Sequence, residues 1–359
     1  MARSSYTRGE EETHLKKHPG VIATLLVIVV AAASSAQTLV VLNKAEATAS
    51  LIDLKSGKVK ATLATAEGPH EGATSPDGRM VVAAAYGTAQ KRGSTLTLID
   101  VATARVIKVI NLEAGVAPHG LRFISPTTLL VTSETTKRLL IVDLERGAAV
   151  AGVETGQDLS HMVAATPDGK RAFVSSINSG TVTAIDVEKR TVLSVIATGA
   201  GAEGIDVSPD GASVWVVNRA ADTVSVIDTT TLKIVATFES PKFPIRVKFT
   251  PDGRMALVSH AQSGDLAFVD AKTHAVMRTM TMNVTGNAEA GRLFQDFGKS
   301  PAPIGIVVTP DSRLAYVACA NADVVAEVDL GKAVIVRWLK AGKEPDGMAY
   351  SPLTAGSGK

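Results

Sequence analysis

The stretch SPDGASVWVVNRAADTVSVIDTTTLKIVATF, residues 208–238, decides the fold of this chain. After its first turn it contains three short runs with the alternating apolar residues of β-strands, separated by a polar loop and by a threonine-rich turn. Ser-Pro-Asp-Gly fixes a tight turn, because proline sets one backbone angle and glycine accepts conformations that other residues avoid. The stretch therefore predicts a strand before the SPDG turn and three strands after it.

The same pattern recurs along the chain. In every copy an aspartate ends one apolar strand and opens a turn, at spacings of 47, 43, 43, 42, 42 and 59 residues. A Ser-Pro or Thr-Pro, usually continuing as Asp-Gly, keeps the same period. The aspartates are Asp53, Asp100, Asp143, Asp186, Asp228, Asp270 and Asp329, and the prolines are Pro76, Pro126, Pro167, Pro209, Pro251, Pro310 and Pro352. Seven four-stranded antiparallel units of this period predict an all-β fold, a seven-bladed β-propeller.

The two ends of the repeat array complement each other. Asp53 has no SPDG turn before it, whereas the last such turn, at Ser351 and Pro352, has no strands after it. We therefore expect residues 37–359 to form one domain whose N- and C-terminal strands share a blade and close the ring. The repeated aspartates are interpreted as turn residues that accept backbone hydrogen bonds.

The repeat resembles that of the YVTN family of seven-bladed propellers. The family unit runs SPDG, YVTN, VSVID, a further strand and a Pro-x-Gly start of the next blade, and the resemblance covers residues 37–352. It implies the fold, but the family hosts exported binding and surface proteins and so implies no single activity. Related seven-bladed propellers include lactonases and streptogramin lyases with active sites at the channel mouth, whose full catalytic set finds no positional match here.

The N-terminal segment has the pattern of an export signal. Lys16 and Lys17 precede the apolar run of residues 21–33, and the small-residue stretch SSAQ follows it. We expect residues 1–36 to be a signal peptide cleaved after Ala36, with an uncleaved anchor as the alternative. The predicted location is periplasmic or secreted, with no stable membrane span after cleavage. Cys319 is the single cysteine, so no intramolecular disulfide forms, and we expect a small buried side chain there.

Candidate functional residues lie at the start of the innermost strands. Innermost strands of seven blades stand roughly 50° apart around a central channel, so equivalent positions form a ring. Aligned on Pro-x-Gly, the central residues in ring order are Asp346, His70, His119, His161, Glu203, Ile245 and Ile304. The placement of His119 depends on a one-residue shift, because SPTT replaces SPDG in its blade. The ring is predicted to have a polar arc of five residues and an apolar arc of two.

Imidazole and carboxylate are ligands that divalent first-row metals prefer, and they also serve as general bases near neutral pH. A divalent metal is therefore the candidate cofactor. The candidate ligands are His70, His119, His161, Glu203 and Asp346. The alternative is that the channel is wet at this level and that repeat duplication copied the histidines without a ligand to bind.

A long insertion is expected to cover the same face. Residues 281–303 account for the spacing of 59, and long loops in compact repeats often carry function. The predicted ligand-binding residues are Arg246, His260, Arg292, Phe294 and Asp296. The alternatives are a self-packed surface loop, a pairing of Arg246 with a neighbouring carboxylate, and a turn role for His260.

The amino-acid composition and net charge favour some classes of function over others. The chain has 359 residues, of which 45% are hydrophobic and 20% charged, enough to bury a substantial core. A net charge of +2 and 4% aromatic residues do not favour nucleic-acid binding. We expect a monomeric, non-catalytic protein that binds a small molecule or a protein partner at the channel mouth. The alternative is a metal-dependent lactonase or streptogramin-lyase-like enzyme that uses the three ring histidines.

Overall fold

The computed structural model describes residues 1–3, 5, 9, 37–113, 115–284 and 297–358. The chain divides into two units, residues 1–34 and residues 35–359, and the fold described below is that of the second. Most of the predicted signal peptide, with its cleavage point after Ala36, lies outside the described residues. Within the described ranges, no helix has both the length and the hydropathy needed to cross a membrane.

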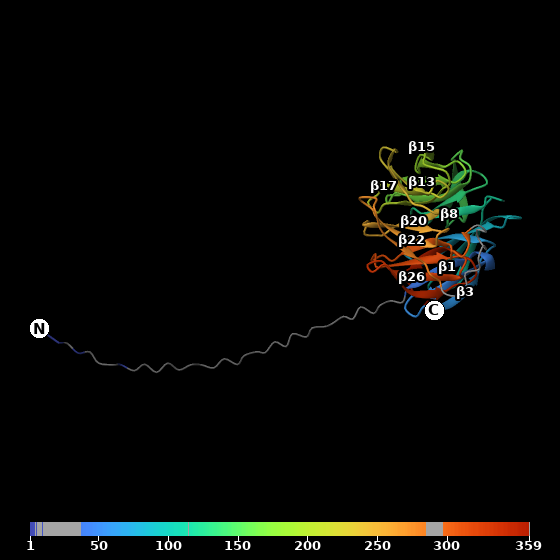
Figure 1. The fold of residues 1–359 in the computed structure, drawn as a ribbon. Helices are drawn as coiled ribbons and strands as arrows, with labels where there is room; N and C mark the ends of the chain where they lie inside the picture. Colours follow the sequence, from blue (N-terminus) through green and yellow to red (C-terminus); the bar gives the residue numbers. More distant parts are fainter. Residues whose placement is uncertain (4, 6–8, 10–36, 114, 285–296, 359) are drawn as a thin grey trace. The chain divides into compact units, whose positions relative to one another are not determined.

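The described residues of the second unit form seven four-stranded antiparallel sheets, the blades of a β-propeller (Figure 1). The innermost strands are β4 (Pro69–Thr74), β8 (Pro118–Phe123), β12 (Ser160–Ala165), β16 (Ala202–Val207), β20 (Pro244–Phe249), β24 (Pro303–Val308) and β28 (Pro345–Ser351). The second strands are β1 (Thr38–Asn43), β5 (Met80–Gly87), β9 (Thr128–Ser133), β13 (Arg171–Ser176), β17 (Ser213–Asn218), β21 (Met255–His260) and β25 (Leu314–Cys319). The predicted fold class is confirmed.

The outer half of each blade follows the same plan. The third strands are β2 (Thr48–Asp53), β6 (Arg92–Asp100), β10 (Arg138–Asp143), β14 (Thr181–Asp186), β18 (Thr223–Asp228), β22 (Asp265–Asp270) and β26 (Val324–Asp329). The outermost strands are β3 (Lys58–Ala64), β7 (Arg105–Asn111), β11 (Ala148–Glu154), β15 (Thr191–Ala197), β19 (Ile234–Glu239), β23 (Val276–Thr281) and β27 (Val334–Lys340). A 3-10 turn, η1 (Lys44–Glu46), follows β1.

The ring closes as predicted, through a blade shared by both ends of the array. β28 pairs antiparallel with β1, placing Ala349 opposite Val40. In Figure 1 the blue β1 accordingly lies among the red strands of the chain's end. Each innermost strand contacts the innermost strands of both neighbouring blades, and β28 contacts β24 and β4. This closure removes the free blade that an open array would leave.

The core lies between blades. Successive residues of a strand point to opposite faces of its sheet, so the apolar run of β17 fills two interfaces. Val214 and Val216 pack with Phe173 of the preceding blade. Trp215 packs with Phe249 of the following blade. Burial on both faces explains why the second strands read as continuous apolar runs in the sequence.

The turns also confirm the sequence interpretation. Each of the seven repeated aspartates accepts a hydrogen bond from a backbone N–H three residues further on. For Asp228 the bond comes from Thr231 N and measures 2.6 Å. Cys319 is fully buried, as expected, and burial raises the pKa of its thiol to about 12. These aspartates and the cysteine therefore have structural roles, which leaves the ring as the candidate site.

Candidate functional site

The predicted ring is present in the structure. Each of its seven residues is the second residue of an innermost strand, including His119 in β8. Around this position the pairing register of every innermost strand shifts against the second strand of its blade. Such β-bulges re-aim side chains. The bulge therefore places the ring side chains at one level of the channel.

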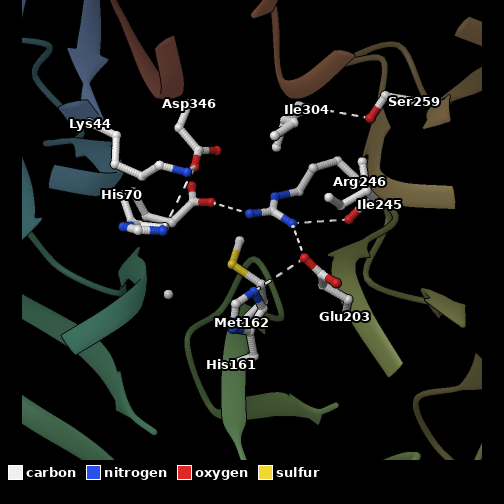
Figure 2. A network of polar contacts seen from close by, with 12 residues as sticks. Lys44, His70, His161, Met162, Glu203, Ile245, Arg246, Ser259, Ile304 and Asp346 are labelled. Carbon is white, nitrogen blue, oxygen red and sulfur yellow. Dashed lines mark hydrogen bonds and ion pairs between the residues drawn. The ribbon is translucent and has the colours of Figure 1, made fainter. Parts of the chain in front are cut away.

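The five polar ring residues are consecutive neighbours. The ring centroids of His70 and His119 lie 5.0 Å apart, and those of His119 and His161 lie 3.7 Å apart. His161 Nε2 lies 3.4 Å from Glu203 Oε1 at one end of the arc. At the other end, His70 Nε2 lies 3.9 Å from Asp346 Oδ2. The structure thus brings together all five residues that the sequence proposed as metal ligands, and Figure 2 shows four of them.

A second ring, which the sequence analysis did not identify, lies against the first. In each blade, the first residue of the innermost strand pairs with a residue at or near the end of the second strand. The second ring consists of the residue that comes immediately after that partner in the chain. Its backbone N–H donates to the carbonyl of the residue just before the innermost strand, as Arg219 N does to Gly201 O at 3.0 Å. The members are Lys44, Tyr86, Glu134, Ile177, Arg219, Ala261 and Ala320.

Polar members of the second ring bind polar members of the first. Glu134 Oε1 lies 2.5 Å from His161 Nδ1, and Glu134 Oε2 accepts a 2.6 Å hydrogen bond from the Tyr86 hydroxyl. Arg219 Nη1 donates to Glu203 Oε2 at 2.5 Å. The sequence contained part of this signal, because five of the seven members stand ten residues after the proline of an SPDG or equivalent turn, whereas Glu134 stands eight residues after Pro126 and Lys44 has no such turn before it. The sequence did not show that the end of each blade's second strand lies next to the first ring.

An ion pair crosses the channel beside the first ring. Arg246, the third residue of β20, donates through Nη2 to Glu71 of β4 at 2.6 Å and through Nη1 to Glu203 at 3.0 Å (Figure 2). Two innermost strands, β24 and β28, separate β20 from β4 on one side of the ring. The guanidinium therefore spans the bore as a plug. Of the two roles predicted for Arg246, the structure shows the pairing with carboxylates.

Glycine occupies the third position of four other innermost strands. A Cβ at Gly305 would lie 2.2 Å from the Asp346 carbonyl oxygen, and a Cβ at Gly347 would lie 2.2 Å from that of His70. Contacts this short are forbidden, so glycine permits the close approach of neighbouring innermost strands. The polar side chains of the first ring are consequently held close to one another.

The apolar arc completes the ring. Ile245 and Ile304 are buried and pack with Ala261 and Ala320, the second-ring members of the same two blades. Figure 2 shows both isoleucines on the Arg246 side of the site. In these two blades, apolar residues occupy both rings. The predicted division into a polar and an apolar arc therefore extends through two layers.

The polar arc holds its histidines in different charge states. Burial would lower the pKa of His161, but hydrogen bonds with Glu134 and Glu203 outweigh it and raise the pKa to about 9. Burial lowers the pKa of His70 to about 4, against the opposing effect of the Asp346 carboxylate. Burial and the positive charge of His161 hold the pKa of His119 well below its usual value. At neutral pH, His161 is charged and the other two histidines are neutral.

Two cavities lie beside the rings. A mouth pocket of about 560 Å³ is lined by Lys44, His70, Tyr86, Arg92 and Glu344, together with neighbouring loop residues. A channel cavity of about 410 Å³ begins at Glu71, Met162 and Arg246 and continues past Arg122, Asp206 and Lys248. The mouth pocket gives access to the polar arc, and the channel cavity lies along the innermost strands.

The remaining predicted ligand-binding residues lie elsewhere or outside the described residues. His260 is buried at the end of β21, where its Nε2 lies 2.8 Å from the Ser240 hydroxyl oxygen. Arg292, Phe294 and Asp296 are outside the described part of the chain, so the cap over the mouth stays a prediction. Phe297, at the edge of that segment, packs against Phe243 with ring centroids 4.9 Å apart.

Comparison with known proteins agrees with this architecture. Residues 125–296 match the YNCE-like beta-propeller family. This match is consistent with the YVTN-type repeat propeller predicted from the sequence. No curated protein sequence matches this propeller. Among solved structures it is similar to Kuenenia stuttgartiensis hydrazine synthase, with a TM-score of 0.66 and 18% identity over 79% of this chain and 90% of that one. At this identity the similarity concerns the fold alone.

Proposed function

We propose that this propeller is a binding protein that holds a small polar molecule in the mouth pocket. The observation that carries the proposal is the position of this pocket, about 560 Å³ in volume, beside His70 and Tyr86. Its volume falls in the range of small-molecule sites, roughly 300–1,000 Å³. His70 is the histidine through which the polar arc meets the pocket, since His119 and His161 do not line it.

The pocket offers several kinds of polar contact. Neutral His70 donates through Nδ1 to the Gly68 carbonyl at 3.2 Å, which leaves Nε2 as an acceptor, and Tyr86 adds an aromatic face. Lys44 is already engaged by Glu344 and Asp346, at 3.4 and 3.5 Å. Arg92 is exposed, with its guanidinium carbon 5.0 Å from the centre of the Tyr86 ring. A carboxylate or phosphate on the ligand would therefore meet Arg92, while the rest of the molecule lies against Tyr86.

The plug supports binding at the mouth over passage through the channel. The ion pair of Arg246 with Glu71 crosses the bore immediately behind the polar arc. A buried pair of this kind is costly to open, because each charge would lose its partner. A molecule that enters the mouth pocket therefore stays on that face of the propeller.

The test is a ligand-observed NMR screen of small polar carboxylates, phosphates and amines against the wild-type protein. Hits are repeated on a Tyr86→Ala/Arg92→Ala variant and on Arg122→Ala, a control that lines the channel cavity instead. We expect binding of genuine hits to weaken at least about tenfold in the first variant and to stay unchanged in the control. Hits whose affinity is the same for the wild-type protein and the Tyr86→Ala/Arg92→Ala variant would refute the proposal.

A second candidate function, a metal-assisted lactonase or lyase, is favoured by the close pair of His119 and His161. One ring is neutral and the other is charged, at 3.7 Å separation, and such divided pairs are typical of acid–base sites. A lactone panel assayed with wild-type protein, His161→Gln and the control His260→Ala tests this reading. Turnover that His161→Gln abolishes would favour the enzyme, whereas no turnover by any of the three would leave binding as the function.

We further propose that the protein works outside the cytoplasm as a monomer. The basic, apolar and small-residue succession of residues 16–36 supports export. The single buried cysteine suits an oxidising compartment, because it leaves no exposed thiol. Mass spectrometry of secreted material should show a chain that begins at Gln37, and light scattering should give the monomer mass. A retained N-terminal segment would instead indicate an anchor.

A further inference from the structure

We propose that His119, Glu134 and His161 form a binding site for a divalent first-row transition metal ion, with zinc as the best fit. Each residue offers one ligand atom, and these atoms all lie within 4.8 Å of one another. The site differs from the set that the sequence suggested. It includes Glu134 of the second ring and excludes His70, Asp346 and Glu203. It is also distinct from small-molecule binding in the mouth pocket, so each can be tested without the other.

The strand architecture fixes the three residues. His119 and His161 start adjacent innermost strands, β8 and β12, and Glu134 follows β9 in the blade of His119. All three are buried, with 2%, 8% and 5% of the residue surface exposed for His119, His161 and Glu134 respectively. Side chains held this way lose little conformational freedom when an ion binds.

His119 supplies the observation that points to a ligand. Its Nδ1 atom is buried and has no hydrogen-bond partner within the described structure. Buried polar atoms are nearly always satisfied, so an unpartnered imidazole nitrogen beside a carboxylate and a second imidazole needs an explanation. A metal ion provides one, because the neutral imidazole nitrogen is a lone-pair donor.

The neighbours of the site have the arrangement that orients metal ligands. Glu134 Oε2 accepts from the Tyr86 hydroxyl at 2.6 Å, so Oε1 is the oxygen that faces the histidines, 2.5 Å from His161 Nδ1. His161 Nε2 faces Glu203 at 3.4 Å, so Nδ1 is the atom that would bind the ion, which would displace the proton that Nδ1 shares with Glu134 Oε1. A ligating histidine commonly donates its second N–H to a carboxylate in this way. Two arginines in turn hold Glu203, namely Arg219 and Arg246.

The donor set selects the ion. Two imidazoles and one carboxylate suit zinc, which in catalytic sites often has three protein ligands and one open position. Calcium and magnesium prefer oxygen ligands alone and are not favoured here. Tetrahedral ligands at about 2.0–2.1 Å from zinc lie roughly 3.4 Å apart, so the Glu134–His161 pair, now 2.5 Å apart, would open when the ion enters, while no ligand atom lies more than 4.8 Å from another.

The experiment titrates metal-free protein with Co²⁺ and Zn²⁺. We expect one ion per chain, with the intense visible absorption of low-coordinate Co²⁺, and displacement of Co²⁺ by Zn²⁺. Glu134→Gln and His119→Gln should weaken binding by at least about 100-fold, more than loss of an outer partner does. Asp346→Asn, a member of the sequence-derived set, should change affinity less than about threefold. Unchanged affinity in Glu134→Gln would overturn the assignment.

A second measurement on the native chain guards against variants that fail to fold. Bound Co²⁺ should shift and broaden the ring resonances of His119 and His161 at substoichiometric amounts. His260 and His274, which lie away from the group, should be unaffected at the same point. Broadening of all histidines together, or of none, would contradict the site. Failure of small molecules to bind in the mouth pocket would not affect either result.

Discussion

The polar and apolar arcs of the first ring have the same backbone conformation but side chains of opposite polarity. His161 and Ile304 both stand second in an innermost strand, at the same bulge, and both are buried. Ile304 packs with Ala320, whereas His161 contacts Glu134 and Glu203. The apolar arc shows that apolar side chains are sufficient to fill this position of the repeat. The fold therefore does not require polar side chains here, and packing alone does not explain why five blades have them.

The largest change in the free energy of unfolding is expected at the Arg246–Glu71 ion pair that crosses the bore. Arg246→Met leaves Glu71 without its ion-pair partner and should lower the free energy of unfolding by about 3–5 kcal/mol, because a buried charge is left uncompensated. Urea denaturation measures the change. Replacing both partners, Glu71→Leu with Arg246→Met, should recover most of the loss, since Glu203 keeps Arg219 and His161. A double variant as unstable as the single one would show that the pair itself stabilises the fold.

The apolar arc should respond through packing alone. Ile304→Ala removes buried methyl and methylene groups and should cost about 3 kcal/mol of unfolding free energy. Chemical denaturation gives this value, and titration of the same variant should show Co²⁺ affinity within about twofold of wild type. Ile245→Val, a milder change in the same cluster, should cost about 1 kcal/mol. A strong loss of metal affinity in Ile304→Ala would mean that the arcs are not independent.

Stability of the metal-free protein should depend on pH through the polar arc. The pKa of His70 is about 4 in the folded protein and about 6.5 unfolded, so acidification from pH 6.5 protonates the unfolded state first and lowers stability. The pKa of His161 is about 9 when folded, so its stabilising contribution is complete below pH 6.5 and is lost as pH rises through 9. These histidines together predict maximal stability near pH 6.5, measurable by denaturation at several pH values.

Single substitutions should show which histidine causes the loss of stability at acid pH (the acid limb) and which causes the loss at alkaline pH (the alkaline limb). His161→Gln should flatten the alkaline limb, because no histidine with a raised pKa remains at this position. His70→Gln should reduce the acid limb, to which His119 also contributes. The apolar arc adds no titrating group in either range. An alkaline limb that persists unchanged in His161→Gln would show that another group causes it.

The smallest expected effect is an increase in the stability of the fold. His119→Leu removes a buried nitrogen without a partner and should stabilise the fold by up to about 1 kcal/mol, since an unsatisfied buried group is replaced by an apolar one of similar size. Thermal and urea denaturation should agree on the sign. The same variant should lose Co²⁺ binding. Destabilisation by more than about 1 kcal/mol would indicate that His119 has a partner in solution that the metal site does not explain.

The sequence by itself determined the repeat, the number of blades and the members of the first ring. Turn residues such as Pro209 and Asp228 depend on local backbone geometry, which nearby residues specify. The strands follow from apolar runs of fixed length. Circular symmetry then places equivalent positions at one level of the channel, so His70 and His161 could be assigned to a common site despite their separation along the chain.

Only the tertiary structure decided which side chains touch. The contact of Glu134 with His161 joins two blades, and the pair of Arg246 and Glu71 crosses the bore. Both depend on the direction that each bulge gives to a side chain and on glycines such as Gly347 that let strands approach closely. These are long-range properties of a closed ring, and no local pattern encodes them. The charge state of His161 follows from the same contacts, because two carboxylates reach it from different blades.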